Sequence, residues 1–414
     1  MHCYVVKNEE MLIQLFHLLL GTILTKIEVK ISLNKRIAPR CNCFIIQSSG
    51  TGKGEAQDAI NQLVGEYNKK VENENLLSFI PKLEVAHRVS DFTTAGWIGS
   101  IERRRTVIYG MLKEKDIILV PEGKTFFEKR EYVGDIRYKL TSALDEPGII
   151  QKRTRLGEIS YESTSSIAVA TIPLPEIDMA ISQEGFFQRF FISFREFSEK
   201  EKNEIDKEKE ELKKLDYDRD IKPKLDNLVT SLIELAKSAM WAGFVGGVRI
   251  EECCVPEMER MRVALREKYF RHQYGDIRDS IVDSFYERLD WLLLELAAHH
   301  AVVEGKSQID LEDYKYAVKA IEWHCESVGR LLDKIVGIKQ DVNEKRKRFI
   351  YKILEMHGGN IVKKELFREL MQWRRVGEWD LGETRTHQFI KSMVSKHELR
   401  FRVGAHGRKV LLLP

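Results

Sequence analysis

Residues 42–54 read Asn-Cys-Phe-Ile-Ile-Gln-Ser-Ser-Gly-Thr-Gly-Lys-Gly and predict the start of an α/β fold. The apolar run from Asn42 to Ile46 has the length of a buried strand, and it enters a glycine-rich turn. From Glu55 to Val71 the apolar residues recur at helical spacing. Because glycine adopts backbone dihedrals that a Cβ atom forbids, such a turn can pass close to a ligand. The stretch therefore predicts a strand, a tight turn and a helix in that order.

Two more apolar segments, Asp116–Val120 and Ser166–Ala170, extend this pattern along the chain. Strands separated by helix-length segments favour an α/β core with a largely parallel sheet, which we expect at residues 41–197. Residues 1–40 would form a helical lead-in. Its apolar stretch Met11–Leu24 is too short for a membrane span, so we expect a buried helix there.

The chain changes character after this core. Residues 198–225 are dense in alternating charge, which predicts a solvated linker helix. Residues 226–338 follow a helical pattern without a convincing strand, which predicts an all-α unit. Residues 342–414 place short amphipathic helices before two strand-like segments around Gly404–Gly407, which predicts a winged-helix domain. From Asp341 onward 17 Lys and Arg stand against nine Asp and Glu, so the excess positive charge lies here.

Composition narrows the class of protein only a little. A chain of 414 residues is long enough for two or three compact units, and its net charge of +3 is too small to identify a partner. The six cysteines include no C-x-x-C pair and no zinc-type spacing with histidine, so we expect them to be reduced and structural. The N-terminal segment lacks the order of a secretory signal. We expect a cytoplasmic protein without a membrane partner.

The glycine-rich turn is the strongest candidate for a binding site. Backbone N–H groups and a helix N-terminus at such a turn can wrap a polyphosphate, and Lys53 would reach its terminal phosphates. The sequence departs from the P-loop pattern at Gln47, which replaces a glycine, and at Gly54, which replaces the hydroxyl residue that binds Mg²⁺. The alternative is a strand–helix turn without a ligand. The predicted ATP-binding residues are Ser49, Gly50, Thr51, Gly52, Lys53 and Gly54.

A P-loop ATPase also needs an acidic group at the end of a neighbouring strand. Glu122 follows the apolar segment Asp116–Val120 and would be the catalytic base, but Pro121 stands where a metal-binding Asp is usual. Either Mg²⁺ is held by phosphates, waters and Glu122, or hydrolysis is slow. The alternative for Glu122 is a surface turn residue. We assign no other side chain to the metal.

Five further segments resemble the ATPase half of the MCM helicases, a group of AAA+ ring ATPases, and the resemblance extends over most of residues 10–335. They match, in order, the helix-2 insertion, the presensor hairpin with sensor 1, the arginine-finger segment and two lid segments. The segments are Thr93–Ser100, Leu144–Pro173, Gly185–Phe191, Tyr286–Ala301 and Ile309–Asp313. The chain has no room for the N-terminal collar of cellular MCM proteins, so the resemblance points to a short relative from a virus or mobile element.

The resemblance assigns roles to particular residues. Lys152, Arg153 and Arg155 would lie on the presensor hairpin and follow single-stranded DNA, although three basic residues on a turn can also be simply solvated. Thr171 would be sensor 1, Arg288 sensor 2, and Arg189 the arginine finger.

An arginine finger acts on the nucleotide of a neighbouring subunit, so Arg189 implies a homo-oligomeric ring, which we expect to be a hexamer. The alternative for Arg189 is stacking on the aromatic rings around it. ATP and Mg²⁺ are the cofactors that the resemblance implies.

The C-terminal domain would contact duplex DNA through cations on its helices and in its wing. The alternative is a basic protein-docking domain. The expected DNA-binding residues there are Arg368, Arg374, Arg375, Arg385, Lys391, Arg402, Arg408 and Lys409.

We expect an ATP-dependent helicase or translocase in DNA replication. Two other functions stay open: a nucleotide-gated DNA clamp or initiator with weak hydrolysis, and an ATPase that regulates a recombinase or packages DNA into a capsid.

Overall fold

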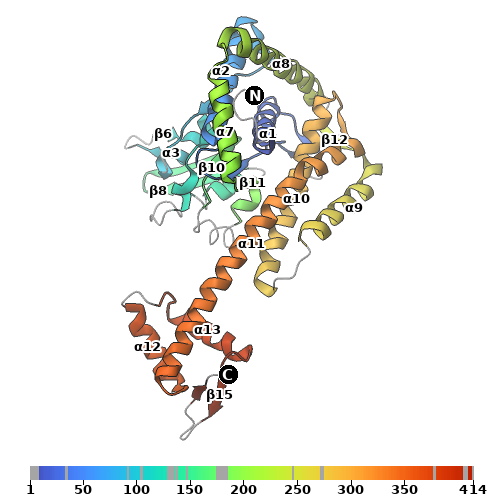
Figure 1. Ribbon diagram of the computed structural model, residues 1–414. Helices are drawn as coiled ribbons and strands as arrows, with labels where there is room; N and C mark the ends of the chain where they lie inside the picture. Colours follow the sequence, from blue (N-terminus) through green and yellow to red (C-terminus); the bar gives the residue numbers. More distant parts are fainter. Residues whose placement is uncertain are drawn as a thin grey trace. The chain divides into compact units, whose positions relative to one another are not determined.

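A computed structural model describes most of the chain (Figure 1). The described residues are 9–32, 36–90, 93–102, 106–127, 136, 139–145, 148–173, 185–244, 247–270, 275–375, 379–403 and 409–412. The chain divides into two compact units, Met1–Leu332 and Asp333–Pro414. None of the described helices is long and apolar enough to cross a membrane.

A five-stranded parallel sheet forms the centre of the first unit. Its strand order is β11-β3-β10-β7-β4. Every residue of β3, β7 and β10 is buried, which explains why these strands read as continuous apolar runs. The strands are β3 (Cys43–Gln47), β4 (Val85–Ala86), β7 (Ile117–Val120), β10 (Ser166–Thr171) and β11 (Phe191–Arg195). The α/β core predicted from the sequence is confirmed at this level.

The order of the strands places a switch point in the direction of the connections beside β3. From β3 the chain moves to β4, the outermost strand on one side of the sheet. It then returns through β7 to β10, which lies next to β3. It then crosses to β11 on the other side of β3. The connections that leave β3 and β10 therefore run in opposite directions. In open parallel sheets, ligands bind outside the carboxyl ends of the strands at such a switch point.

Helices cover the sheet. Helix α1 (Glu9–Lys26) packs against β3, β10 and β11 and is buried along most of its length, so it belongs to the core rather than to a separate lead-in. Helix α2 (Lys53–Asn73) follows the glycine-rich turn, as predicted. The described residues between β4 and β10 include, besides β7, short helices and two hairpins. They are α3 (Thr94–Ile98), α4 (Met111–Glu114), β5 (Gly99–Ile101) with β6 (Val107–Tyr109), and β8 (Ile149–Thr154) with β9 (Gly157–Glu162).

The second half of this unit is mainly helical, but the expectation of an all-α segment is wrong. Two short strands from this half, β12 and β13, join β1 and β2 in a small mixed sheet of order β13-β12-β1-β2. Strands of two or three residues are too short to leave a periodic signal. The elements are β1 (Ile31–Ser32), β2 (Arg36–Ile37), α7 (Glu199–Leu212), α8 (Lys222–Phe244), β12 (Val248–Ile250), α9 (Val255–Leu265), α10 (Gly275–Val303), β13 (Gln308–Ile309) and α11 (Leu311–Met356).

The predicted linker at 198–225 contains a helix and a break. Helix α7 begins with a capping box between Ser198 and Glu201, and it ends at Leu212. Helix α8 begins at Lys222, directly after a π-helical turn at Tyr217–Ile221, and Pro223 is its second residue.

The C-terminal unit combines helices with a three-stranded antiparallel sheet of order β14-β16-β15. The last part of α11 supplies Ile350 and Leu354 to its core, which also contains Trp379 and Leu411. Helix α11 therefore crosses the boundary that the sequence placed near residue 340. The other elements are β14 (Asn360–Val362), α12 (Lys363–Arg375), α13 (Glu383–Ser395), β15 (Arg400–Val403) and β16 (Lys409–Leu412). Residues 404–408 lie outside the described part.

Candidate functional site

The turn after β3 has the backbone of an anion-binding loop. Gly50 and Gly52 have positive φ angles of 77° and 88°, which L side chains rarely adopt. Gly52 is the N-cap of α2 and has no side chain to bond the first N–H groups of the helix. Positive φ angles at glycine and a helix N-terminus that lacks a side-chain cap are features that phosphate-binding loops share.

Lys53 is folded back onto the loop. Its Nζ donates hydrogen bonds to the carbonyl oxygens of Gln47 at 2.9 Å and Ser48 at 2.6 Å. Burial lowers the pKa of Lys53 to about 8; the charge of Glu55 opposes this shift and that of Lys209 adds to it. The two oxygens that accept hydrogen bonds from the ammonium group are thus neutral, at a place where a phosphate would supply negative charge.

The other loop residues differ in how well they suit a nucleotide with Mg²⁺. Thr51 is buried, and its hydroxyl donates to the Ser48 carbonyl oxygen at 2.8 Å. Ser49 is exposed. A Cβ atom at Gly54 would meet nothing within 4 Å, so space exists for the missing hydroxyl. Gly54 itself supplies no metal ligand, because glycine has no side chain.

Glu122 and Thr171 lie at the same edge of the sheet as the loop. Glu122 follows β7, and its side chain is 76% exposed, with Lys124 at 4.0 Å as its ion-pair partner. Thr171 is the last residue of β10; it is paired in register with Ile46 of β3 and is buried. Gln57 of α2 donates to the carbonyl oxygens of Val120 and Ala168, which ties α2 to the ends of these strands. The sequence-predicted base and sensor therefore lie at the carboxyl ends of β7 and β10.

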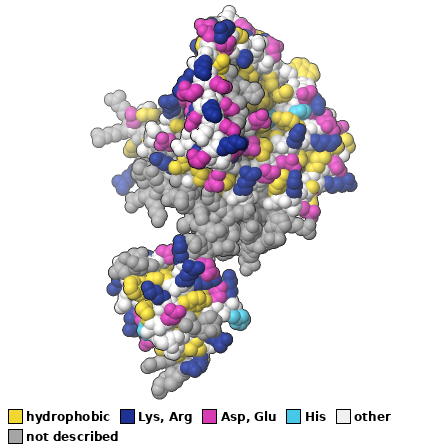
Figure 2. All heavy atoms as spheres, in the orientation of Figure 1, with side chains coloured by type: hydrophobic (Ala, Val, Ile, Leu, Met, Phe, Trp, Pro, Cys, Tyr) yellow, Lys and Arg dark blue, Asp and Glu magenta, His cyan; other side chains and the backbone are white. Residues whose placement is uncertain are grey.

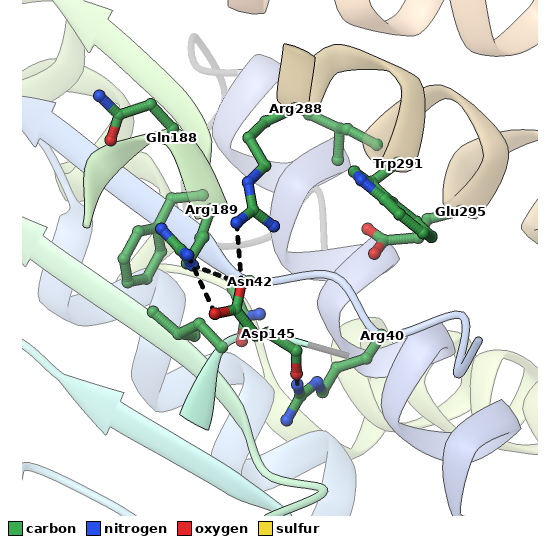
Figure 3. A pocket seen from close by; sticks show the side chains of 11 residues that line it. Arg40, Asn42, Asp145, Gln188, Arg189, Arg288, Trp291 and Glu295 are labelled. Atoms are coloured by element: carbon green, nitrogen blue, oxygen red, sulfur yellow. Dashed lines mark hydrogen bonds and ion pairs between the residues drawn. The ribbon is translucent and has the colours of Figure 1, made fainter. Parts of the chain in front are cut away.

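A pocket of about 360 Å³ lies at the opposite edge of the sheet and contains both predicted arginines (Figure 3). Arg189 donates from Nε and Nη2 to the two carboxylate oxygens of Asp145, at 2.7 and 2.9 Å. Arg288 approaches the same carboxylate from α10, with Nη2 at 3.0 Å from Oδ1. The side chain of Arg189 is only 11% exposed. One carboxylate thus holds two arginines from distant parts of the chain.

Arg40 fixes the backbone beneath this pocket. Its buried guanidinium donates to the carbonyl oxygens of Ala143 and Asp145, and to those of Ser163 and Ser165. These bonds tie the segment that carries Asp145 to the start of β10. Neither Arg40 nor Asp145 was expected from the sequence. A single sequence contains too many charged residues to reveal which of them meet.

The pocket and the loop are too far apart to form one site within a single chain. Asn42, which lines the pocket, precedes β3, whereas the loop follows its last residue, Gln47. Five residues at a rise of about 3.3 Å each separate the ends of the strand by about 16 Å. The Arg189 and Arg288 side chains point into the pocket, where Asp145 holds them. They cannot reach a nucleotide on their own loop.

The predicted hairpin exists and packs against a second one. Lys152 donates to the Gly99 carbonyl oxygen at 2.8 Å, and the Tyr161 hydroxyl donates to the Ile98 carbonyl oxygen at 3.0 Å. Arg153 lies on the exposed side with Glu158 at 3.7 Å, and Arg155 is exposed in the turn. The β5–β6 and β8–β9 hairpins therefore support each other, and two of the three predicted cations are directed to solvent.

The cations predicted to bind DNA in the C-terminal unit are mostly at its surface. On the face of this unit drawn in Figure 2, Lys and Arg side chains lie among apolar and acidic ones. Arg408 lies outside the described residues. The exposed ones are Arg368, Arg374, Arg375, Arg385, Lys391, Arg402 and Lys409.

Two smaller groups of side chains lie outside the loop and the pocket. Glu251, Cys253 and Cys254 bring their ligand atoms within 4.8 Å of one another, although their spacing is not C-x-x-C. The adjacent His299 and His300 have separate partners, the Pro39 carbonyl oxygen and the Asp313 carboxylate.

No known family model matches the sequence, and no curated protein is significantly similar to it.

Proposed function

We propose that the protein is a P-loop ATPase of the AAA+ type that assembles into a ring on DNA and moves along one strand, as the resemblance to MCM helicases implies. One observation carries this proposal. A loop suited to phosphates lies at one edge of the parallel sheet, and two arginines converge at the other edge. A complete site with loop and arginines requires two copies of the chain.

The loop would bind the triphosphate of ATP. Its backbone N–H groups and the start of α2 would surround the phosphates, while Lys53 would leave the carbonyl oxygens of Gln47 and Ser48 for a phosphate oxygen. These two hydrogen bonds join a charged donor to neutral acceptors, so contacts with charged phosphate oxygens offset their loss. When bound, Mg²⁺ would neutralise phosphate charge, held by phosphate oxygens, waters and Glu122.

Arg189 and Arg288 would face the nucleotide of the adjacent subunit. A phosphate competes with Asp145 for these guanidinium groups, because phosphate and carboxylate both bind arginine through paired N–H donors. Arg189 would neutralise charge that develops on the terminal phosphate during hydrolysis. The aromatic alternative for Arg189 has less support, since its bonding partner is a carboxylate.

Movement on DNA would use the hairpins. Arg153 and Arg155 are exposed at the end of β8, where they can follow a phosphate backbone without reading bases. We take the C-terminal unit as a winged helix that adds duplex affinity through its exposed cations. Arg153→Ala combined with Arg155→Ala should weaken binding of single-stranded DNA and reduce its salt dependence, and leave ATP binding unchanged.

A nucleotide-gated clamp or initiator is the second candidate. Gly54 and Pro121 both remove a usual magnesium contact, and Glu122 is largely exposed. These features favour ATP binding over fast turnover.

DNA-stimulated ATPase activity, measured for wild type and Glu122→Gln beside a forked-duplex unwinding assay, separates the candidates. Turnover that is lost in Glu122→Gln, together with unwinding, supports the helicase. Tight ATP-dependent DNA binding without turnover supports the clamp. Turnover without unwinding supports the regulator or packaging ATPase, and absence of ATP binding by the wild type would overturn all three.

A further inference from the structure

Helix α7 contacts the phosphate loop directly. Lys209, near the end of this helix, donates from Nζ to the Gly50 carbonyl oxygen at 2.9 Å and lies 3.0 Å from Oε1 of Glu55. Figure 1 shows α7 running from beside β11 towards α2. The only buried residue of α7 is Ile205, so few contacts hold this helix against the core.

Lys209 differs from the other lysines of α7. Lys202 of α7 and Lys213, the residue that follows the helix, pair with nearby carboxylates of α7, Glu199 at 2.5 Å and Glu210 at 2.6 Å. Such pairs within a helix are worth a few tenths of a kcal/mol and point to no ligand. The side chain of Lys213 is 69% exposed, whereas that of Lys209 is 28% exposed because it lies on the loop.

The ammonium groups of Lys53 and Lys209 act on each other. Both lie against the backbone of the same short loop, and the charge of Lys209 contributes to lowering the pKa of Lys53. Glu55 is the acidic group that balances them here, and its own side chain is about half exposed. An anion on the loop would therefore lie within reach of two cations.

We propose that Lys209 is a second phosphate-binding cation, which exchanges Gly50 and Glu55 for a phosphate oxygen when a nucleoside triphosphate occupies the loop. This inference rests on the proposed function. Through this exchange, α7 closes over the bound nucleotide. The position of α7 therefore differs between the empty and the occupied loop.

The exchange is favourable on electrostatic grounds. The contacts that Lys209 loses are one neutral carbonyl oxygen and a half-exposed ion pair, and pairs of that kind are worth about 0–1 kcal/mol. A triphosphate offers several charged oxygens at the same place, and hydrogen bonds between two charged groups are about twice as strong as neutral ones.

ATP affinity of the full chain tests the inference. Lys209→Ala should weaken ATP binding about tenfold, since it removes one charge-assisted contact with the triphosphate. Lys213→Ala, at the residue that follows the helix, is the control and should stay within about twofold of wild type. Glu55→Gln, which removes the competing carboxylate, should tighten ATP binding. Hydrogen exchange of residues 199–212 should slow with ATP in wild type and not in Lys209→Ala.

The outcomes separate this inference from the proposed function. Equal ATP affinity of Lys209→Ala and Lys213→Ala, with wild-type binding intact, would overturn the role of Lys209 alone. Tighter binding by Lys209→Ala would also overturn it, because α7 would then be an inhibitory contact. A wild-type chain that binds no ATP would overturn the proposed function and this inference with it.

Discussion

The two edges of the parallel sheet hold their cations in different ways. At the carboxyl edge, Lys53 is bound by two neutral carbonyl oxygens of its own loop. At the amino edge, the Asp145 carboxylate binds Arg189 and Arg288. An anion readily replaces the neutral acceptors of a lysine, whereas the carboxylate partner of an arginine is replaced only by another anion. The loop can therefore exchange neutral acceptors for an anion, whereas the arginine pair would exchange Asp145 for an anion carried by a neighbouring subunit.

Mixing two inactive variants tests whether these edges meet across subunits, and it should give the largest effect. Lys53→Ala should abolish nucleotide binding, and Arg189→Ala should keep binding but lose hydrolysis. In a random mixed ring, about a quarter of the interfaces join an intact loop to an intact Arg189, so about a quarter of wild-type ATPase activity should return.

The control for this experiment is the double variant with both substitutions. Mixed with Lys53→Ala, it should restore nothing, because no interface then has an intact loop. If the two single variants each assemble into rings and their mixture stays inactive, the edges do not meet.

Asp145, the counter-charge of the arginine pair, should contribute to the free energy of unfolding. Asp145→Asn keeps the shape of the side chain but leaves the nearly buried Arg189 without a charged partner, so the free energy of unfolding should fall by about 1–3 kcal/mol after allowance for partial exposure. Lys53→Met at the other edge should change it by less than about 1 kcal/mol, since it removes a buried charge with neutral partners. Urea denaturation measures both.

Asp290→Asn is the matched control. Asp290 also binds an arginine, Arg262, at 2.8 Å, but Arg262 keeps Glu259 as a second partner. The loss of stability should therefore be smaller than for Asp145→Asn. An Asp145→Asn variant as stable as wild type would remove the distinction between the edges.

The lowered pKa of Lys53 predicts that the loop edge depends on pH. ATP favours the charged lysine, and the unliganded loop loses this charge as pH rises through about 8. ATP affinity should then fall by up to about tenfold per pH unit above pH 8. Lys53→Arg should remove the dependence, because a guanidinium group stays charged over this range. A flat profile for wild type would contradict the prediction.

The same shift affects folding with the opposite trend. The unfolded chain keeps the proton of Lys53 up to the ordinary value of 10.5, whereas the folded chain releases it near 8. Between these values the unfolded state binds more protons, so this group makes the free energy of unfolding rise with pH. ATP binding and stability should therefore change in opposite directions above pH 8.

Local features of the fold were predictable, and distant contacts were not. The strand, turn and helix around residues 43–73 follow from apolar spacing and glycine, which act over a few residues. The β8–β9 hairpin was expected only from the resemblance. The contacts of Asp145 with Arg189 and of Lys209 with Gly50 join residues 44 and 159 positions apart. Charged residues are abundant along the chain, so no sequence pattern marks these pairs. Strands β12 and β13 were missed because they are so short.

Gly54 offers the smallest and most local test at the loop edge. Gly54→Ser adds the hydroxyl that the usual magnesium site has, into open space, and should raise Mg²⁺-dependent turnover by about two- to tenfold. Gly50→Ser is the control, because the same side chain there is strained by a φ angle of 77° and should cost about 1 kcal/mol of stability. ATPase rates at varied Mg²⁺ concentration measure the gain. If Gly54→Ser folds, binds ATP and hydrolyses it no faster than wild type, the missing hydroxyl does not limit this site. The exposed position of Glu122 would then account for slow turnover.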